Sequence, residues 1–390
     1  MTRKFITLFI PLISAFFLIT GCDDSDEVPN LRPKMDYHTL TTETVYSEAF
    51  VDEEGNSTVD LKEGNLRLKM FQALNYHSTS NVSAGTAIDE TALLNMFSNT
   101  GNPFYDISTN TISVSGAELN ASGIQLRNAV ASSLEAADAE VVRKKIEGYF
   151  TAIDVASQSL STTASPGVAG KLGNYLVDSR GLEVAQEIQK SLIGALQLDY
   201  IANVLLDEGL KADNSKLVGD NNYTQLEHNW DVAYGLLTLN PIYLDGATDA
   251  SRNTVEFGAG SYIWEYNKAT YDQIYPAFLK GRAAIVNNDR EQYEALATLI
   301  RREFEIAIAN AAIGYLNKWK TATDDAGRAH AIGEGVGFIY SLRFAKLHGI
   351  DATYSDTILE DLIGSGGGFW DLNAEKINAA IEAIELPFVN

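Results

Sequence analysis

Apolar residues recur every three or four positions along most of the chain, which is the spacing of one face of an α-helix. Four segments carry the pattern most clearly. They are Leu182, Ala185, Ile188, Leu192 and Leu196; Leu226, Trp230, Ala233 and Leu237; Tyr293, Leu296, Ile300, Phe304, Ala307, Ala311 and Tyr315; and Ile332, Val336 and Ile339. Asp178 and Ser179 are candidate N-caps of the first segment. The third predicts a long core helix.

Alternation with a period of two, typical of strands, is scarce. The best example is residues 111–114, bounded by Asn110 and Gly116. The glycine-rich residues 364–368 lack the Gly-Lys-Ser/Thr of a phosphate loop, so we expect them to end one helix before Asn373 caps the last. The fold class is therefore predicted as all-α, with helical bundles and long connections.

The N-terminus has the features of an export signal. Arg3 and Lys4 precede an apolar run from Phe5 to Ile19, which is too short for a permanent membrane span. Residues 19–22 then resemble the bacterial lipoprotein signal, in which small residues precede a cysteine that receives lipid. We predict that residues 1–22 form this signal, with Cys22 as the lipidation site. Cys22 is the single cysteine of the chain, so no disulfide is expected.

The remainder divides into a tether and a helical region. Residues 23–60 are predicted to be a polar tether with an ordered but irregular entry segment, and residues 61–390 one helical domain or two helical subdomains. The lipid would hold the protein in the cell envelope, on a periplasmic or surface-facing side. The expected partners are a membrane, through the lipid, and envelope transport proteins.

Charge narrows the classes of ligand. The chain has 29 basic and 52 acidic residues, a formal net charge of −23. Such a chain repels phosphate backbones, so a nucleic acid is not expected as a partner. Cations are the natural ligands, although acidity also serves simply to keep an exported protein soluble.

Two polar groups at helical spacing suggest a metal site. Glu227, His228 and Asp231 lie on one side of the Trp230 stripe, and His330 and Glu334 stand one helical turn apart. Imidazole and carboxylate ligands from facing helices bind divalent or ferric ions such as iron, zinc or manganese. The alternative for each group is a solvated helix face with a local hydrogen bond. The other three histidines are predicted to be surface residues.

Aromatic residues offer a second kind of site. Tyr262, Trp264 and Tyr266, with Tyr271 and Tyr275 nearby, would allow stacking on a sugar or a peptide. The alternative is core and loop packing.

Catalytic patterns are weak. No His-Glu-x-x-His or Gly-x-Ser-x-Gly motif occurs, and the cysteine is assigned to lipid. Glu183, Glu187 and Lys190 are spaced as a surface ion-pair group on a helix; catalysis would require a cleft and a shifted pKa. A non-catalytic protein is favoured, with an open metal site as the route by which an enzyme would arise.

Several segments resemble a family of bacterial envelope lipoproteins known as domain of unknown function 4856. They include residues 94–99 with 101–104, 119–123, 167–170, 181–186, 227–231 with 233–235, 278–285, and 330–332 with Glu334. The resemblance implies a helical fold and an envelope location and brings no established activity. A looser similarity is to the imelysin-like proteins, which are linked to iron acquisition. This chain lacks their Gly-x-His-x-x-Glu pattern and has His228-x-x-Asp231 instead. Iron as the ligand is therefore suggested by analogy alone.

The sequence thus predicts a lipid-anchored envelope binding protein. The first hypothesis for its ligand is a metal held by Glu227, His228, Asp231, His330 and Glu334. The alternatives are capture of a glycan or peptide by the aromatic residues, and a scaffold without a small-molecule ligand.

Overall fold

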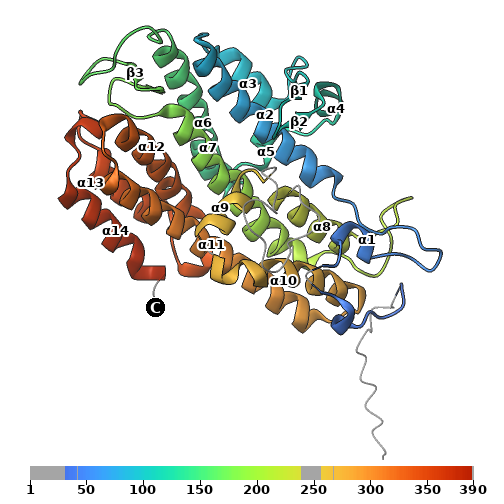
Figure 1. Cartoon of the computed structure of the whole chain (residues 1–390). Coiled ribbons are helices and arrows are strands. Elements are labelled where there is room, and N and C mark those ends of the chain that lie inside the picture. The colour runs from blue at the N-terminus through green and yellow to red at the C-terminus, as the bar shows by residue number, and fades with distance from the viewer. Residues whose placement is uncertain (1–30, 42, 239–255, 267, 389–390) are drawn as a thin grey trace, which may run out of the picture.

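The computed structural model confirms the all-α class (Figure 1). It describes residues 31–41, 43–238, 256–266 and 268–388. Within these residues the strands form only two small antiparallel hairpins. Of the strand predicted at residues 111–114, Ser113 and Val114 form the second strand of the first hairpin, with Val114 opposite Ile107.

The first half of the chain forms helices and two short hairpins. In the described residues between 31 and 60, the helices are the short η1 and α1. The elements are η1 (Tyr37–Thr39), α1 (Tyr46–Ala49), α2 (Lys62–Ala84), α3 (Glu90–Ser98), β1 (Ile107–Ser108), β2 (Ser113–Val114), α4 (Gly116–Ala121), α5 (Leu126–Ala129), α6 (Ala136–Ser157), β3 (Gly170–Leu172) and β4 (Tyr175–Val177).

The second half begins with the central helix and ends with a group of long helices. Its elements are α7 (Val184–Leu192), the π-helix η2 (Ile193–Leu205), η3 (Glu208–Lys211), α8 (Gln225–Leu237), α9 (Ala259–Tyr266), α10 (Lys268–Val286), α11 (Arg290–Thr321), α12 (Asp325–Ser341), η4 (Leu342–Phe344), η5 (Lys346–His348), α13 (Ala352–Ile363), η6 (Gly368–Asp371) and α14 (Ala374–Phe388).

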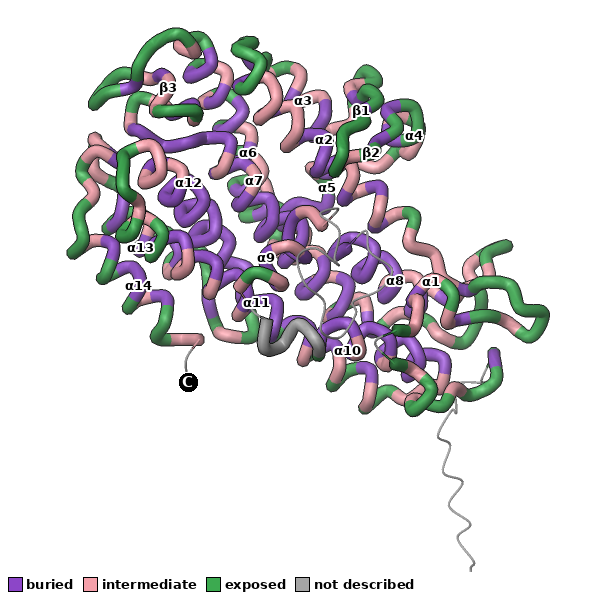
Figure 2. The backbone as a smooth tube through the Cα atoms, in the orientation of Figure 1, coloured by how far each residue is buried: buried purple, intermediate pink, exposed green. Residues whose placement is uncertain are grey.

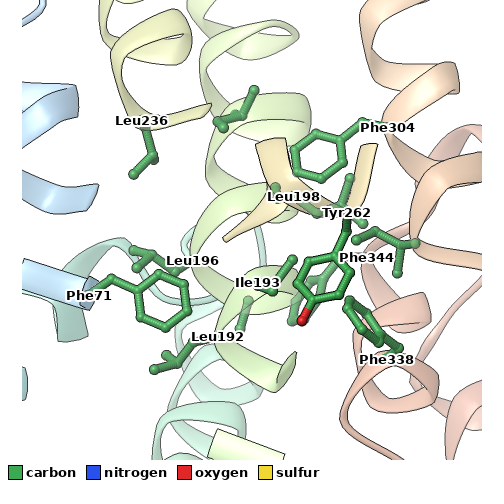
Figure 3. Close-up of a cluster of buried hydrophobic side chains, with 14 of the residues drawn as sticks. Phe71, Leu192, Ile193, Leu196, Leu198, Leu236, Tyr262, Phe304, Phe338 and Phe344 are labelled. Atoms are coloured by element: carbon green, nitrogen blue, oxygen red, sulfur yellow. The ribbon is translucent and has the colours of Figure 1, made fainter. Parts of the chain in front are cut away.

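The core surrounds α7 and η2, which are apolar or buried on nearly every side (Figure 2). The close-up in Figure 3 shows Leu192, Ile193 and Leu196 of this segment between Phe71 of α2 and Phe338 of α12. A helix that is apolar all round has to be covered on all sides, and here α2, α6, α8, α11 and α12 do so.

All four predicted helical segments are present, and their apolar stripes face the core. Trp230 is fully buried and donates its indole N–H to the carbonyl of Phe278 at 2.9 Å. The predicted caps of α7 are wrong. Glu183 is the N-cap residue, while the carboxylate of Asp178 accepts the backbone N–H groups of Arg180 and Leu182 in the preceding turn. Gly364 ends α13, and Asn373 caps α14, as expected.

Glycines bring α7 and η2 close to α12. A Cβ at Gly337 would lie 2.5 Å from Cβ of Lys190, and one at Gly194 would lie 2.3 Å from Cβ of Ser341. No real side chain tolerates such distances, so these positions allow the two helix backbones to approach. Glu183 and Lys190 consequently lie against α12.

Candidate functional site

The segment that carries Glu227 starts as a capped helix. The Thr224 hydroxyl accepts the backbone N–H of Glu227 at 3.2 Å, and the Glu227 carboxylate accepts the backbone N–H of Thr224 at 2.8 Å. This reciprocal pair is a capping box, which satisfies two N–H groups at the start of α8. Glu227 therefore has a structural role at the helix terminus.

A buried arginine forms ion pairs with both carboxylates of α8, Glu227 and Asp231. The guanidinium of Arg282 lies 2.8 Å from Oε1 of Glu227 and 3.0 Å from Oδ1 of Asp231, and all three side chains are almost completely buried. Arg32 forms a second ion pair with Glu227, and Tyr46 donates its hydroxyl to Asp231 at 2.7 Å. Burial would raise the pKa of Glu227, but the two arginines outweigh it and hold that pKa below its usual value. These carboxylates are already neutralised by side chains of the chain itself.

His228 faces a different pair of carboxylates. Its ring is stacked on Tyr223 with centroids 4.7 Å apart, and its Nδ1 and Nε2 atoms lie 3.9 Å from Asp60 and 3.7 Å from Glu63. Burial lowers the pKa of His228, but these acidic neighbours outweigh it and raise the pKa above 6.5. The protonated ring that they favour has no lone pair for a metal.

His330 has an equivalent environment at the interface of α7 and α12. It stacks on Tyr175 at 4.3 Å, and its Nδ1 and Nε2 atoms lie 2.6 Å from Glu183 and 3.5 Å from Glu334. Lys190 Nζ lies 3.5 Å from the same Oε1 atom of Glu334. Burial lowers the pKa of His330, but the two glutamates outweigh it and raise the pKa. The result is a chain of alternating charges across the interface.

The structure therefore divides the five predicted metal ligands into two clusters. Glu227, His228 and Asp231 lie on α8, and Figure 1 shows α8 well away from α12, which carries His330 and Glu334. In the described part of the chain, no group of three or more histidine, cysteine or acidic side chains is placed to hold a metal ion. The charged partners supplied by Arg282, Arg32 and Lys190 explain why, since they occupy the carboxylates.

The predicted surface ion-pair group on α7 is wrong. Glu183, Glu187 and Lys190 are 7%, 6% and 2% exposed, and they do not pair with one another among the described residues. Glu183 pairs with His330 and Lys190 with Glu334, both from α12. Glu187 instead lines a hollow together with residues of α6 and α13.

The predicted stacking residues belong to the core. Tyr262 is buried against Phe338 with ring centroids 4.7 Å apart, and Figure 3 shows it among Phe338, Phe344 and Ile193. Tyr266 lies 5.7 Å from the ring of Tyr315, and Trp264 is half-buried on the same helix, α9. The side chain of Tyr271 lies outside the described residues. This arrangement corresponds to the core-packing alternative.

A hollow of about 580 Å³ lies beside Glu187, and we call it the α7 cavity. Its lining comes from α6, the turn before α7, α12 with η4, and α13 with the glycine-rich turn that follows. The lining residues are Val141, Lys145, Tyr149, Arg180, Glu187, Val336, Tyr340, Arg343, Asp356, Leu359, Glu360, Ile363, Gly364, Ser365 and Gly366. A smaller hollow of about 280 Å³ shares Lys145, Tyr149, Arg180 and Glu187 with it.

Basic groups line this cavity although the chain as a whole is strongly acidic. Arg343 is held by Asp356 at 2.6 Å and lies over the ring of Tyr340 at 3.6 Å, and Arg180 donates to the carbonyl of Ile363. Lys145 Nζ lies 4.9 Å from the centre of the Tyr149 ring and forms no ion pair with any described carboxylate. Lys145 and Arg180 thus face the cavity with no carboxylate of the described residues bound to them.

Glu187 is the most unusual group in the lining. No hydrogen bond or ion pair to its carboxylate is present among the described residues, although only 6% of the residue is exposed. Burial, assisted by the charge of Asp178 and opposed by Lys145 and Arg180, raises its pKa from 4.5 to about 7. A carboxyl group of this kind in a cavity is a recognised mark of a functional site.

The sequence did contain a signal for this site. The run from Leu192 to Leu206 is apolar at nearly every position, which is typical of a central helix rather than an amphipathic surface helix. Glu187 and Lys190 lie on the helix that leads into this run, so their side chains are expected to be buried with it. The basic residues that face Glu187 come from distant segments and carry no local signal.

The predicted lipidation site Cys22 lies outside the described residues. In the parts that the structure describes, no helix has the length and apolar character needed to cross a membrane.

The fold and the cavity together define an all-α protein with the buried carboxyl group of Glu187 in the wall of a hollow that has apolar and charged lining residues. The chain belongs to the family described as domain of unknown function (DUF4856), whose model matches residues 47–388. No curated protein and no solved structure matches it. The family resemblance found in the sequence is therefore confirmed, whereas the similarity to imelysin-like proteins stays a prediction.

Proposed function

We propose that this protein is a lipid-anchored, non-catalytic capture protein of the bacterial cell envelope, and that it binds a small organic ligand in the α7 cavity. The observation that carries the proposal is the cavity itself, about 580 Å³ in volume, with the nearly buried carboxyl of Glu187 in its wall, which no described residue pairs with. Ligand sites are typically hollows of this size with apolar walls and a few polar groups.

The lining supports binding of an organic molecule rather than a bare ion. Val336, Leu359 and Ile363 supply apolar wall, and Tyr149 and Tyr340 supply aromatic surface. The organic-ligand hypothesis from the sequence is kept, with the α7 cavity in place of the aromatic residues of α9.

Ligand binding is tested by filling the cavity. Gly366 lies in the lining, its φ is not positive, and a Cβ there would meet nothing within 4 Å. Gly366→Trp should therefore add bulk at the wall without disturbing the fold. Val155→Trp is the matched control, because Val155 is 65% exposed on α6 and lines none of the hollows described.

The protein without residues 1–22 would be screened by thermal shift against amino acids, dipeptides, monosaccharides, organic acids, divalent metals and ferric citrate. We expect a compound among the organic classes to raise Tm in the wild type and in Val155→Trp but not in Gly366→Trp. If no organic compound acts through the cavity, the proposal is wrong.

The metal hypothesis predicts a different pattern in the same screen. Stabilisation by a metal alone, lost in His228→Ala/His330→Ala and kept in Gly366→Trp, would assign binding to Glu227, His228, Asp231, His330 and Glu334. Elemental analysis of the purified protein gives the metal and its stoichiometry.

The lipid anchor is a separate part of the proposal. It rests on the basic residues, the apolar run and Cys22 at the N-terminus. Mass spectrometry of the N-terminal peptide should find diacylated Cys22, and Cys22→Ala should release the protein from the membrane fraction. An unmodified Cys22 in a membrane-free protein would contradict the anchor.

A further inference from the structure

We infer that the ligand of the α7 cavity is a small organic acid, whose anionic group lies against Lys145 and Arg180 and whose apolar part lies against Leu359 and Ile363. The inference rests on the proposed function and adds the chemical class of the ligand and a coupling of binding to protonation of Glu187.

The charges around Glu187 favour an anion over a cation. Those that face it come from four elements: Lys144 and Lys145 of α6, Asp178 and Arg180 before α7, Arg343 of η4, and Asp356 and Glu360 of α13. Asp178 is engaged by backbone N–H groups, Lys144 by Glu147 at 2.8 Å, and Asp356 by Arg343. Lys145 and Arg180 are the cations that line both hollows and have no carboxylate bound at hydrogen-bond distance among the described residues.

Glu187 decides when the anion can bind. Ionised Glu187 would repel an anion held by Lys145 and Arg180, whereas protonated Glu187 does not repel it and can donate a hydrogen bond to it. Because burial raises the pKa of Glu187 to about 7, the carboxyl is partly protonated near neutral pH. An anion that enters should shift this balance towards the protonated form.

The apolar part of the ligand follows from the remaining wall. Leu359 and Ile363 stand one helical turn apart on α13 and line the cavity, and Val336 faces it from α12. Val141, 67% exposed on α6, lies in the same lining. A ligand with a short alkyl or aryl part would cover this surface.

Three probes of equal length and different charge test the inference: hexanoate, hexanol and hexylamine. Hexanoate stays ionised between pH 6 and 8, so a pH dependence in this range reports on the protein. Dissociation constants would be measured by NMR titration of the protein without residues 1–22, with Gly366→Trp to show that binding occurs in the cavity.

We expect hexanoate to bind about tenfold more weakly at pH 8 than at pH 6, which follows from a group that titrates near pH 7. Glu187→Gln should bind hexanoate with equal affinity at the two pH values. Lys145→Met should weaken hexanoate about tenfold and leave hexanol unchanged, and Lys211→Met, which removes an exposed lysine paired with Glu208, should change neither.

The outcomes separate the two proposals. Binding of hexanol or hexylamine as tight as that of hexanoate, abolished by Gly366→Trp, would overturn the organic-acid inference and leave the capture function standing. A pH profile that is the same in wild type and Glu187→Gln would likewise overturn the proton coupling. Saturable binding by none of the three probes would overturn the capture function in this cavity.

Discussion

The Nδ1 atom of His330 lies 2.6 Å from Oε2 of Glu183, across the interface between α12 and α7. The other ring nitrogen faces Glu334, whose carboxylate in turn faces Lys190. Two residues predicted as metal ligands are thereby part of an ionic contact that joins two core helices. The stability of this contact should depend on pH.

His330→Gln should lower the free energy of unfolding more at pH 6 than at pH 9. Because the pKa of His330 is raised in the folded state, its contribution is fully present below about pH 6.5 and is lost as the pH rises through the folded pKa. The difference between the two pH values should be on the order of 1 kcal/mol, since the side chain is partly exposed. Urea unfolding at both pH values measures it.

His77→Gln is the control, because its effect on the free energy of unfolding should change with pH in the opposite direction. Burial lowers the pKa of His77, so the folded state disfavours its charged form, and the substitution should be more favourable at low pH than at high pH. Parallel pH profiles for the two variants would contradict the assignment of His330.

Gly337→Ala should destabilise the protein by about 1–3 kcal/mol, because its Cβ would lie 2.5 Å from Cβ of Lys190 and force α12 away from α7. Gly335→Ala is the matched control on the same helix. Its Cβ would lie 3.7 Å from Leu316, which is ordinary contact, so the gain in helix propensity should make it neutral or stabilising by up to about 1 kcal/mol. Thermal unfolding of the two variants measures the difference, and equal Tm values would contradict the close approach.

Arg282→Met should destabilise the protein by about 3–5 kcal/mol, because it leaves the buried carboxylates of Asp231 and Glu227 with reduced compensation. Arg290→Met, which breaks the exposed pair with Glu294, should cost less than about 0.5 kcal/mol. Chemical unfolding at pH 7 compares them. A small loss of stability in Arg282→Met would contradict this, because it would show that the carboxylates of Glu227 and Asp231 do not need Arg282.

Glu187→Gln should stabilise the ligand-free protein above pH 7 and change little at pH 4. A carboxyl whose folded pKa is raised to about 7 from 4.5 costs stability as the pH rises through that range, because it is ionised more easily in the unfolded chain. The gain at pH 8 should be on the order of 1–3 kcal/mol. Urea unfolding at pH 4 and pH 8 checks it, and a loss of stability at pH 8 would contradict the buried, unpaired environment.

The sequence by itself determined the helical class and most of the core. Periodicity placed Trp230 and the long stripe of α11 on buried faces, and the glycine-rich segment with Asn373 marked the end of one helix and the start of the next. These features are local, because they depend on spacing along one helix and on the conformational preferences of single residues. The segments that resemble domain of unknown function 4856 also identified the family.

Only the tertiary structure decided what the charged residues do. In the sequence, Glu227 and Asp231 are spaced to bind a cation, but in the structure Arg282 of α10 pairs with both. Glu187 has the spacing of a surface residue, but in the structure it lies among residues of α6, α12 and α13. The charge state and accessibility of a side chain depend on groups that are distant in sequence and close in space. For that reason the spacing that correctly predicted the helices could not distinguish a metal ligand from half of an ion pair.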